Sequence, residues 1–367
     1  MAMGGELAPE PLILAGPVSL SGRYAALGRL AADGLRQVVD DVANAGGVEV
    51  GGRTLIPVLV LLDDESTPDG VRRRLDAIAG ADVIVGPYGS DLVREAAEWA
   101  TTNGRIVWNH GASADDVERA ATVISVASPA SRYHEAVLEA IAQRLPGADI
   151  LVGAGRGRFG RSVAEGAIET ASRLGLSIVD VVTPAEVPAD LAADVLLLAG
   201  SFEQDVAAIR RLRRRPTVVA AVAGALGAFA DELGGGAEGV IAPSQWEEGL
   251  RFVCDVGPTQ ALVVRALRAR ITPSLSVGAR LERVDYPAAQ AYACGLLALH
   301  CATVADCLDE EILAATARQL RCTTFFGQFG LGADGRQLDH QVVVVQWHNG
   351  VKSVVWPPAS AEATMIV

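Results

Sequence analysis

The chain has 367 residues, of which 50% are hydrophobic and 20% are charged, a balance typical of folded α/β proteins. That length exceeds what one small core needs and predicts two globular lobes. The net charge of -13 and the lack of a long basic stripe exclude a nucleic acid as an expected partner.

Strand-sized apolar runs alternate with longer amphipathic stretches over the first third of the chain. The predicted strands cover residues 12–18, 55–62, 82–86, 105–109 and 123–127. The clearest helix covers 27–44, because Leu27, Gly34 and Val38 recur near helical spacing. Gly46 follows as its stop signal. This alternation predicts a doubly wound unit around a parallel sheet.

A second alternation begins after Ser128. Its predicted helices and strands cover residues 133–144, 150–153, 162–174, 178–182, 195–199, 205–214 and 218–222. Long helices at 259–270 and 287–304 follow without strands between them, so we expect them to pack back on the first unit. The C-terminal segment predicts a hairpin, because Asn349 and Gly350 supply the positive φ angles of a tight turn.

A chain that visits one unit, then the other, and then returns crosses between them several times. We therefore predict an α/β fold of two doubly wound, Rossmann-like lobes, joined by a hinge and separated by a cleft. The predicted boundaries are 11–128 plus 250–328 for lobe 1, 129–249 plus 329–358 for lobe 2, and flexible tails at 1–10 and 359–367.

The loops that follow the strands offer candidate ligand contacts, because ligands of doubly wound lobes meet the carboxyl ends of the strands. These loops combine hydroxyl and glycine residues with aromatic rings, which suits a polar head group on a hydrophobic body. The candidate ligand-binding residues are Leu27, Tyr88, Ser90, His110, Gly111, Ser113, Phe159, Phe202 and Trp246. Ser90 and Ser113 would serve equally well as helix N-caps. His110 has no placed nucleophile beside it and is interpreted as a ligand contact or a loop residue.

The glycine-rich segment at 155–160 favours a different function. It fits the G-x-G-x-x-G pattern of dinucleotide sites, and Asp180 follows after a suitable interval. Asp180 lies inside an apolar run, however, and not clearly at a strand end. Motifs of serine hydrolases, P-loop proteins and zinc proteases are absent from the sequence. We therefore expect a protein that is not an enzyme and uses no cofactor.

Two further patterns have ordinary structural interpretations. The arginine-rich run at 210–215 closes a predicted helix, where cations offset the carbonyl end of the helix dipole. The five cysteines are odd in number and include no C-x-x-C, which favours buried thiols over a zinc site.

The sequence contains no obvious membrane or export segment. Its longest apolar runs, such as 195–199 and 342–345, are strand-sized and far from the roughly 20 residues that cross a bilayer. Residues 1–11 show no basic region followed by an apolar run. We therefore expect either that an export signal has been removed or that the protein is cytoplasmic.

An ordered set of short motifs resembles the type I solute-binding proteins of branched-chain amino-acid and amide transport systems. The motifs are GPVSLSG at 16–22, AALG at 25–28, NAGG at 44–47, DD at 63–64, VGPY at 85–88, YPAAQAY at 286–292, FFG at 325–327 and QW at 346–347. The resemblance covers nearly the whole chain.

The resemblance implies a Venus-flytrap fold with three crossings between the lobes, near Ser128, Ser244 and Phe329. It also implies an extracytoplasmic receptor that captures a small carboxylate, amino acid or amide and delivers it to the membrane permease of an ABC importer. A cytoplasmic ligand sensor of the same fold is the alternative, because unpaired cysteines suit a reducing compartment. A dinucleotide-dependent enzyme is a third interpretation.

The family pattern also has implications for the pocket. Positions that hold a ligand carboxylate in amino-acid-binding members match Ser90, Gly111 and Ser113. Two tyrosines of such sites are matched by Phe159 and Phe202. The acidic residue that receives a ligand ammonium should fall near residues 223–224, where the chain has alanine and glycine. A carboxylate or amide with an apolar or aromatic body is therefore expected, and the aromatic residues bounding it would be Trp108, Phe159, Phe202 and Trp246.

Overall fold

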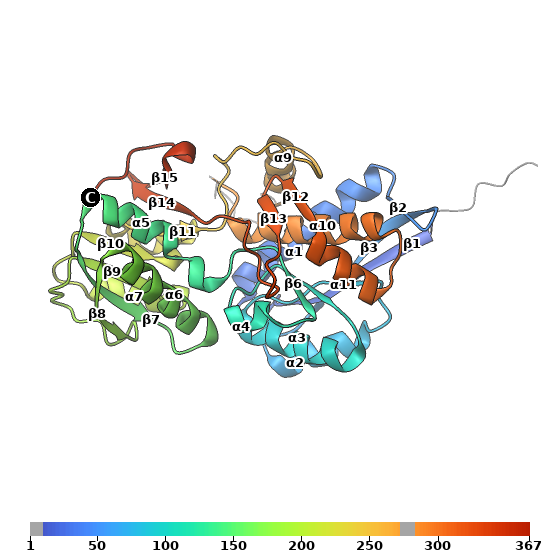
Figure 1. Ribbon diagram of the computed structural model, residues 1–367, viewed down its shortest axis with the longest axis horizontal. Coiled ribbons are helices and arrows are strands. Elements are labelled where there is room, and N and C mark those ends of the chain that lie inside the picture. The colour runs from blue at the N-terminus through green and yellow to red at the C-terminus, as the bar shows by residue number, and fades with distance from the viewer. Residues whose placement is uncertain (1–9, 272–282) are drawn as a thin grey trace, which may run out of the picture.

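Two mixed α/β lobes lie side by side in the computed structural model, which describes residues 10–271 and 283–367 (Figure 1). This arrangement confirms the predicted fold class. Strands and helices alternate in both lobes, and each lobe is built around its own sheet.

The first lobe contains β1 (Glu10–Val18), α1 (Ala25–Asn44), β2 (Val48–Val50), β3 (Arg53–Asp63), α2 (Pro68–Ala77), β4 (Val83–Ile84), α3 (Ser90–Asn103), β5 (Val107–Asn109), α4 (Asp115–Glu118) and β6 (Val123–Ser125). The strand order is β2-β3-β1-β4, with β1 parallel to both neighbours and β2 antiparallel at the edge. The Gly86 N–H donates to the Trp108 carbonyl at 2.7 Å, which joins this sheet to the parallel pair β5-β6.

Helices cover both faces of this sheet, as the alternation along β1 requires. Leu12 and Leu14 belong to the apolar cluster that includes α1. Ala15 belongs to the opposite cluster, formed with α2 and α3. Successive side chains of a strand point to opposite faces, so a strand buried on both sides is apolar throughout.

Helices α9 (Gln260–Ile271) and α10 (Tyr286–Ala305) pack on α1 in the first lobe, as predicted, and α11 (Glu310–Gln319) follows them. Helix α10 is long and apolar enough to cross a membrane by length and composition, which corrects the expectation that no stretch reaches that length. Of its apolar window, 78% is buried inside the protein, as in the core helix of a soluble protein. Its apolar sequence is explained by burial on nearly all sides.

The second lobe contains α5 (Glu135–Arg144), β7 (Asp149–Ala154), α6 (Arg158–Leu174), β8 (Ser177–Val182), β9 (Val195–Ala199), α7 (Phe202–Arg211), β10 (Val218–Ala221), α8 (Ala228–Leu233) and β11 (Ile241–Ser244). It is completed by the C-terminal strands β14 (Val343–His348) and β15 (Val351–Trp356). The seven strands have the order β15-β14-β11-β10-β9-β7-β8. The predicted hairpin is confirmed, and Asn349 and Gly350 have φ angles of 50° and 74°.

Three segments cross between the lobes, and hydrogen bonds join them to one another. The Ser128 N–H donates to Oε1 of Gln245 at 3.0 Å, and Nε2 of Gln245 donates to the Ser128 carbonyl at 3.2 Å. The Ser128 hydroxyl donates to the His340 carbonyl at 2.9 Å. Nε2 of His340 lies 2.8 Å from the Gln245 carbonyl. Each crossing segment therefore contacts both of the others, and we call these three residues the hinge cluster.

The third crossing lies later in the chain than the position implied by the resemblance. Phe329 belongs to β13 (Gly327–Gly330), which pairs with β12 (Arg321–Thr324) and packs in the core cluster of the first lobe. The chain enters the second sheet only at Val343. The aromatic residues of this segment bury their rings near Trp246, which keeps the β12-β13 pair with the first lobe.

The C-terminal residues 359–367, for which we predicted a flexible tail, contact the second sheet. Met365 is buried in the core of the second lobe. The Ile366 N–H donates to Oε1 of Gln346 at 2.8 Å, and Nε2 of Gln346 donates to the Ile366 carbonyl at 2.7 Å. The C-terminus therefore packs against the second sheet at β14, the neighbour of the edge strand β15.

Helices α1 and α10 approach each other closely at Gly34. A Cβ atom there would lie 2.1 Å from the Ala288 carbonyl oxygen, which belongs to the backbone of α10. We predict that Gly34→Ala destabilises the protein by roughly 1–3 kcal/mol, because the two helices must move apart. Urea unfolding measures the change. Gly80→Ala is the control, since nothing lies within 4 Å of that position. Equal stability of both variants would contradict the close packing.

His340 makes the hinge cluster sensitive to acid. Its Nε2 faces a carbonyl and must carry the proton, while its buried Nδ1 has no hydrogen-bond partner among the described residues. Burial lowers the pKa of His340 from 6.5 to about 4. The folded-state pKa is below the unfolded value, so this histidine contributes stability that is present above pH 6.5 and lost as the pH falls towards 4.

We predict that the difference in unfolding free energy between the wild type and His340→Gln depends on pH. The stability advantage of the wild type should shrink by about 3 kcal/mol between pH 7.5 and pH 4, because only the wild type must bind a proton on unfolding. Chemical unfolding at a series of pH values measures it. A difference that stays constant over this range would show that the imidazole is not held neutral.

Candidate functional site

The loops at the carboxyl ends of β4 and β5 lie against each other. The Gly89 N–H donates to the Gly111 carbonyl at 2.7 Å, next to a parallel bridge between Tyr88 and Gly111. The Ser90 hydroxyl, at the start of α3, accepts a hydrogen bond from the Ala114 N–H at 3.2 Å. The structure therefore brings the predicted first-lobe residues of the two loops to one edge.

Gly111 itself is engaged within the first lobe. A Cβ atom at this position would lie 2.6 Å from the Pro87 carbonyl oxygen and from Cα of Tyr88, so no larger residue fits without a backbone shift. Its N–H donates to Oδ1 of Asn109 at 3.0 Å. The backbone of Gly111 therefore shapes the loop, and the Ser113 hydroxyl beside it is the group that reaches towards the second lobe.

Tyrosine hydroxyls extend this edge across to the second lobe. Oγ of Ser113 lies 3.1 Å from the hydroxyl of Tyr133, which follows the first crossing. The hydroxyls of Tyr88 and Tyr286 lie 3.4 Å apart. Phe159, at the start of α6, packs edge-on against Tyr133 with 5.1 Å between the ring centroids. We call the four hydroxyl-bearing side chains, Tyr88, Ser113, Tyr133 and Tyr286, the hydroxyl wall.

The hydroxyl wall is neutral at physiological pH. Burial raises the pKa of Tyr88, Tyr133 and Tyr286 above the ordinary value of 10. His110, fully buried in the first lobe, has its pKa lowered by burial from 6.5 to about 4. Protonated phenols and serine hydroxyls can donate hydrogen bonds to a polar head group, and the aromatic rings can contact an apolar body.

No carboxylate stands at positions 223–224, where the family resemblance implies an acid that binds a ligand ammonium group. Ala223 and Gly224 form part of a short 3-10 turn, Val222–Ala225. Asp205 is near this turn, but its carboxylate accepts the N–H groups of Ala223 at 3.3 Å and of Gly200 at 2.8 Å. Burial raises the pKa of Asp205 to about 7. Its two oxygens therefore serve the backbone of the second lobe.

Besides the buried His110, four predicted residues lie outside the hydroxyl wall and the loops beside it. Trp108 and Trp246 are fully buried in the core cluster of the first lobe, and Nε1 of Trp246 donates to the Phe325 carbonyl at 3.1 Å. Phe202 lines a separate hollow of about 470 Å³ beside α7 and α8, together with Arg210 and Glu232. Leu27 is half-buried near the start of α1.

The residues Tyr133 and Tyr286 were not among the predicted site residues. Tyr286 stands in the motif at 286–292 that carries part of the family resemblance, and it begins α10. Tyr133 follows the first crossing by five residues. A buried tyrosine directly after a lobe crossing or at a helix start near the cleft is the signal that could have pointed to them.

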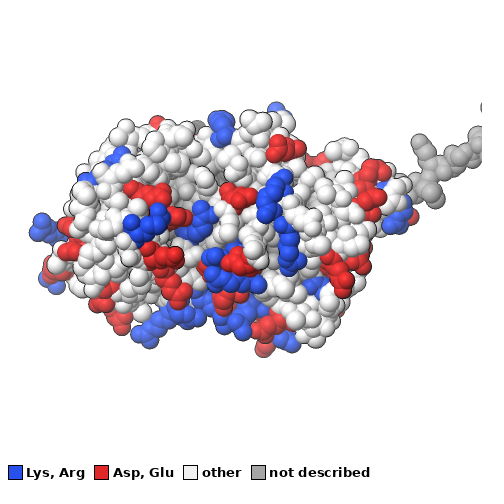
Figure 2. All heavy atoms as spheres, viewed as in Figure 1, with Lys and Arg blue, Asp and Glu red and all other residues white. Residues whose placement is uncertain are grey.

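Ionic contacts close one side of this region. Arg158 of α6 pairs with Asp116 of the first lobe and lies 3.8 Å from Asp91. The Asp115 N–H donates to the Ser162 hydroxyl at 3.3 Å. Charged side chains of both signs gather where the two lobes meet (Figure 2). The lobes are therefore in contact beside the hydroxyl wall.

The glycine-rich segment at 155–160 forms a tight turn and not an open anion site. A Cβ atom at Gly160 would lie 2.2 Å from the Gly155 carbonyl oxygen. Arg158 from this turn is directed at the acidic residues of the first lobe. Asp180 lies within the exposed edge strand β8, where its carboxylate accepts its neighbour's N–H. These placements do not favour the dinucleotide interpretation.

The chain's other candidate chemistry gives no metal centre. Among residues 10–271 and 283–367, no group of three or more histidine, cysteine or acidic side chains is placed to hold a metal ion. The five cysteines are free thiols in the structure. In the arginine-rich run at 210–215, Arg210, Arg211 and Arg215 donate to carbonyl groups, and Arg213 pairs with Asp190 at 3.1 Å.

Comparison with known proteins gives one family and many similar folds. A family model described as periplasmic binding protein matches residues 14–352. No curated protein matches the sequence.

The similar solved structures include a leucine binding protein of Thermotoga maritima, with a TM-score of 0.76 and 16% identity over 94% of this chain and 97% of that one. A branched-chain amino acid transporter substrate binding protein of Streptococcus pneumoniae, in complex with isoleucine, has a TM-score of 0.74 and 18% identity over 95% and 100%. A solute binding protein of an ABC transporter of R. palustris, in complex with benzoate, has a TM-score of 0.73 and 18% identity over 96% and 98%.

Proposed function

The chain belongs to the periplasmic binding protein family, and from that membership we propose that it is the extracytoplasmic substrate-binding protein of an ABC importer. In this role it captures one small solute between its lobes and delivers it to a membrane permease. The similar folds solved with isoleucine and with benzoate support a small organic acid as the kind of ligand.

We propose a carboxylate or amide with an apolar or aromatic body as the ligand class. The hydroxyls of Ser113 and Tyr133, 3.1 Å apart and drawn from the two lobes, are the observation that carries this proposal. A ligand carboxylate or amide oxygen can accept hydrogen bonds from such groups, and the Phe159 ring beside them can contact its body.

The second lobe argues against a ligand ammonium group. Alanine and glycine occupy positions 223–224, and the carboxylate of Asp205 is engaged by two backbone N–H groups. An ammonium group buried without a charged partner is costly. Ordinary amino acids should therefore bind less well than acids or amides that lack the amine.

The two-lobe construction supports capture by closure. Both lobes contribute to the hydroxyl wall, so a solute bound there contacts both lobes only when they are together. Such a ligand binds the closed form more tightly and shifts the equilibrium towards it. The permease would then recognise the closed form.

A thermal-shift screen tests the proposed ligand class. Benzoate, phenylacetate and benzamide are expected to raise the midpoint of unfolding, and leucine and isoleucine are not. A ligand at 100 times its dissociation constant should add about 2.7 kcal/mol of stability. Stabilisation by leucine or isoleucine would contradict the missing ammonium site, and a flat response to all five compounds would contradict the proposed ligand class.

Ser90→Ala tests the position of the head group. The loss of one hydrogen bond to a charged group should weaken carboxylate binding by about 1.5–3 kcal/mol, on the order of ten- to a hundredfold. Titration calorimetry measures the affinity. Ser172→Ala on the exposed face of α6 is the matched control and should leave it unchanged. An unchanged affinity in Ser90→Ala would place the head group elsewhere.

A further inference from the structure

Asp285 stands at the N-cap position of α10 but does not cap its own helix. Its two carboxylate oxygens instead lie 2.9 and 3.2 Å from the N–H of Gly227, in the second lobe. Asp309, at the N-cap of α11, shows the usual arrangement and accepts the N–H groups of Glu311 and Ile312 at 3.0 and 3.1 Å. The Asp285 carboxylate is therefore used between the lobes.

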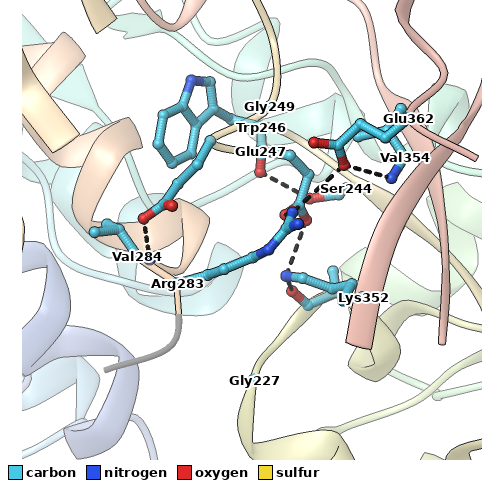
Figure 3. Close-up of polar contacts among 12 residues, drawn as sticks. Gly227, Ser244, Trp246, Glu247, Gly249, Arg283, Val284, Lys352, Val354 and Glu362 are labelled. Atoms are coloured by element: carbon cyan, nitrogen blue, oxygen red, sulfur yellow. Dashed lines mark hydrogen bonds and ion pairs between the residues drawn. The ribbon is translucent and has the colours of Figure 1, made fainter. Parts of the chain in front are cut away.

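The second partner of Asp285 is Lys352, the only lysine in the chain. Lys352 lies on β15 of the second sheet, and its side chain is only 4% exposed. Its Nζ lies 2.9 Å from a Glu247 oxygen (Figure 3). It also lies 3.8 Å from an Asp285 oxygen and donates to the Ala225 carbonyl. A buried ammonium group requires such partners, since it has lost its water.

The two carboxylates that face Lys352 come from different parts of the molecule. Glu247 lies on the second crossing segment, directly after the hinge residue Gln245 and Trp246. Asp285 begins a helix of the first lobe. Glu247 is held in the first lobe as well, because Trp246 is buried in that core and the Glu247 carbonyl accepts Nε2 of Gln260 from α9 at 3.2 Å. Rotation of the lobes about the hinge cluster would therefore separate Lys352 from both carboxylates.

A second ion pair runs beside this contact. Nη1 of Arg283, next but one to Asp285, lies 3.5 Å from Oε2 of Glu362 and 3.9 Å from Oε2 of Glu247 (Figure 3). Oε2 of Glu362 also accepts the N–H of Val354 on β15 at 3.0 Å. The chain around Asp285 is thus joined to the second lobe by two neighbouring charged side chains.

Asp285 also stands next to the hydroxyl wall. Tyr286 follows it directly, and its hydroxyl lies 3.4 Å from that of Tyr88. On the other lobe, Ala225 ends the turn at 222–225, where no acid stands to bind an ammonium group, and Gly227 follows this turn. The inter-lobe contact therefore joins a first-lobe element that carries a wall residue to the second-lobe turn at residues 222–225.

We propose that Asp285 is a positioning residue, a latch that holds the closed form by binding the Gly227 N–H and Lys352 across the lobes. Closure brings Lys352 of the second lobe to both first-lobe carboxylates, and Asp285 also accepts the Gly227 N–H. The latch sets how much of the protein is closed before a solute arrives. It rests on the opening and closing of the proposed receptor, but not on the identity of the solute.

The single lysine makes the latch measurable without a ligand. We would label the native protein with acetic anhydride at constant pH and follow the peptide that contains Lys352 by mass spectrometry. Nζ should react slowly in the wild type compared with the urea-unfolded chain. In Asp285→Asn it should react at least tenfold faster than in the wild type, because one of the two carboxylates that Lys352 meets across the lobes has lost its charge and the closed form is held less tightly. Asp309→Asn, which makes the same exchange at an N-cap of the same lobe that bonds only its own helix, should react at the wild-type rate.

A second variant removes the Gly227 N–H that Asp285 accepts, without changing any charge. Gly227 has φ -56° and ψ -41°, and Leu226 before it has φ -94° and ψ 141°, which are conformations that proline and its preceding residue adopt. Gly227→Pro therefore deletes the N–H that Asp285 accepts, and a Cβ atom there meets nothing closer than 3.5 Å. Lys352 should again be labelled faster than in the wild type.

The outcomes separate the latch from the proposed function. Labelling of Lys352 in Asp285→Asn and Gly227→Pro within twofold of the wild type would overturn the latch, as would a wild-type rate equal to that of the unfolded chain. If one variant fails to fold, the other variant and the wild-type comparison still decide. Faster labelling together with a failed solute screen would support the latch and reject the ligand class.

Discussion

The side-chain amide of Gln245 is the contact on which the rest of the structure depends. One amide both accepts the N–H and donates to the carbonyl of Ser128, and its own backbone carbonyl faces His340. Three chain segments that pass between the lobes would otherwise bury unpaired backbone groups. Because these bonds lie within the crossing segments, they can persist while the two lobes, each with its own sheet, change their relative orientation.

Neutral side chains form the candidate site, and charged side chains lie around it. The hydroxyl wall is made of neutral side chains, so in the proposed function it selects a solute by hydrogen bonds and shape and not by charge. The charged contacts lie around it, with Arg158 and Asp116 on one side and Asp285 and Lys352 near the hinge. Ion pairs join the surfaces where the lobes meet, and positions 223–224 carry no acid, which is why the proposed ligand class lacks a cationic head group.

The fold could be predicted because its signals are local and repeated. Apolar runs of strand length, helices with glycine stops and the Asn349-Gly350 turn each indicate their element without reference to distant residues. Helix α10 shows the limit of this reasoning. Its apolar composition would suit either a membrane-spanning helix or a buried core helix. The close packing of α1 on α10 at Gly34 identifies it as a core helix.

The part of the candidate site that could be predicted is the part formed by loops directly after strands. Ser90 and Ser113 follow strands and therefore fall at the expected edge. Trp246 has the same kind of position, but its ring turns into the first-lobe core because Phe325 offers a carbonyl and a ring face there. Asp285 looks like an ordinary N-cap before a proline at 287, and nothing local shows that Gly227 will compete for it.

Small-angle X-ray scattering of the wild-type protein, before and after addition of the tightest-binding solute, tests the central claim most directly. If two lobes close over one solute about the hinge cluster, the radius of gyration falls on binding and the longest distances in the molecule shorten. A solute that binds stoichiometrically while the scattering curve stays the same would contradict capture by closure.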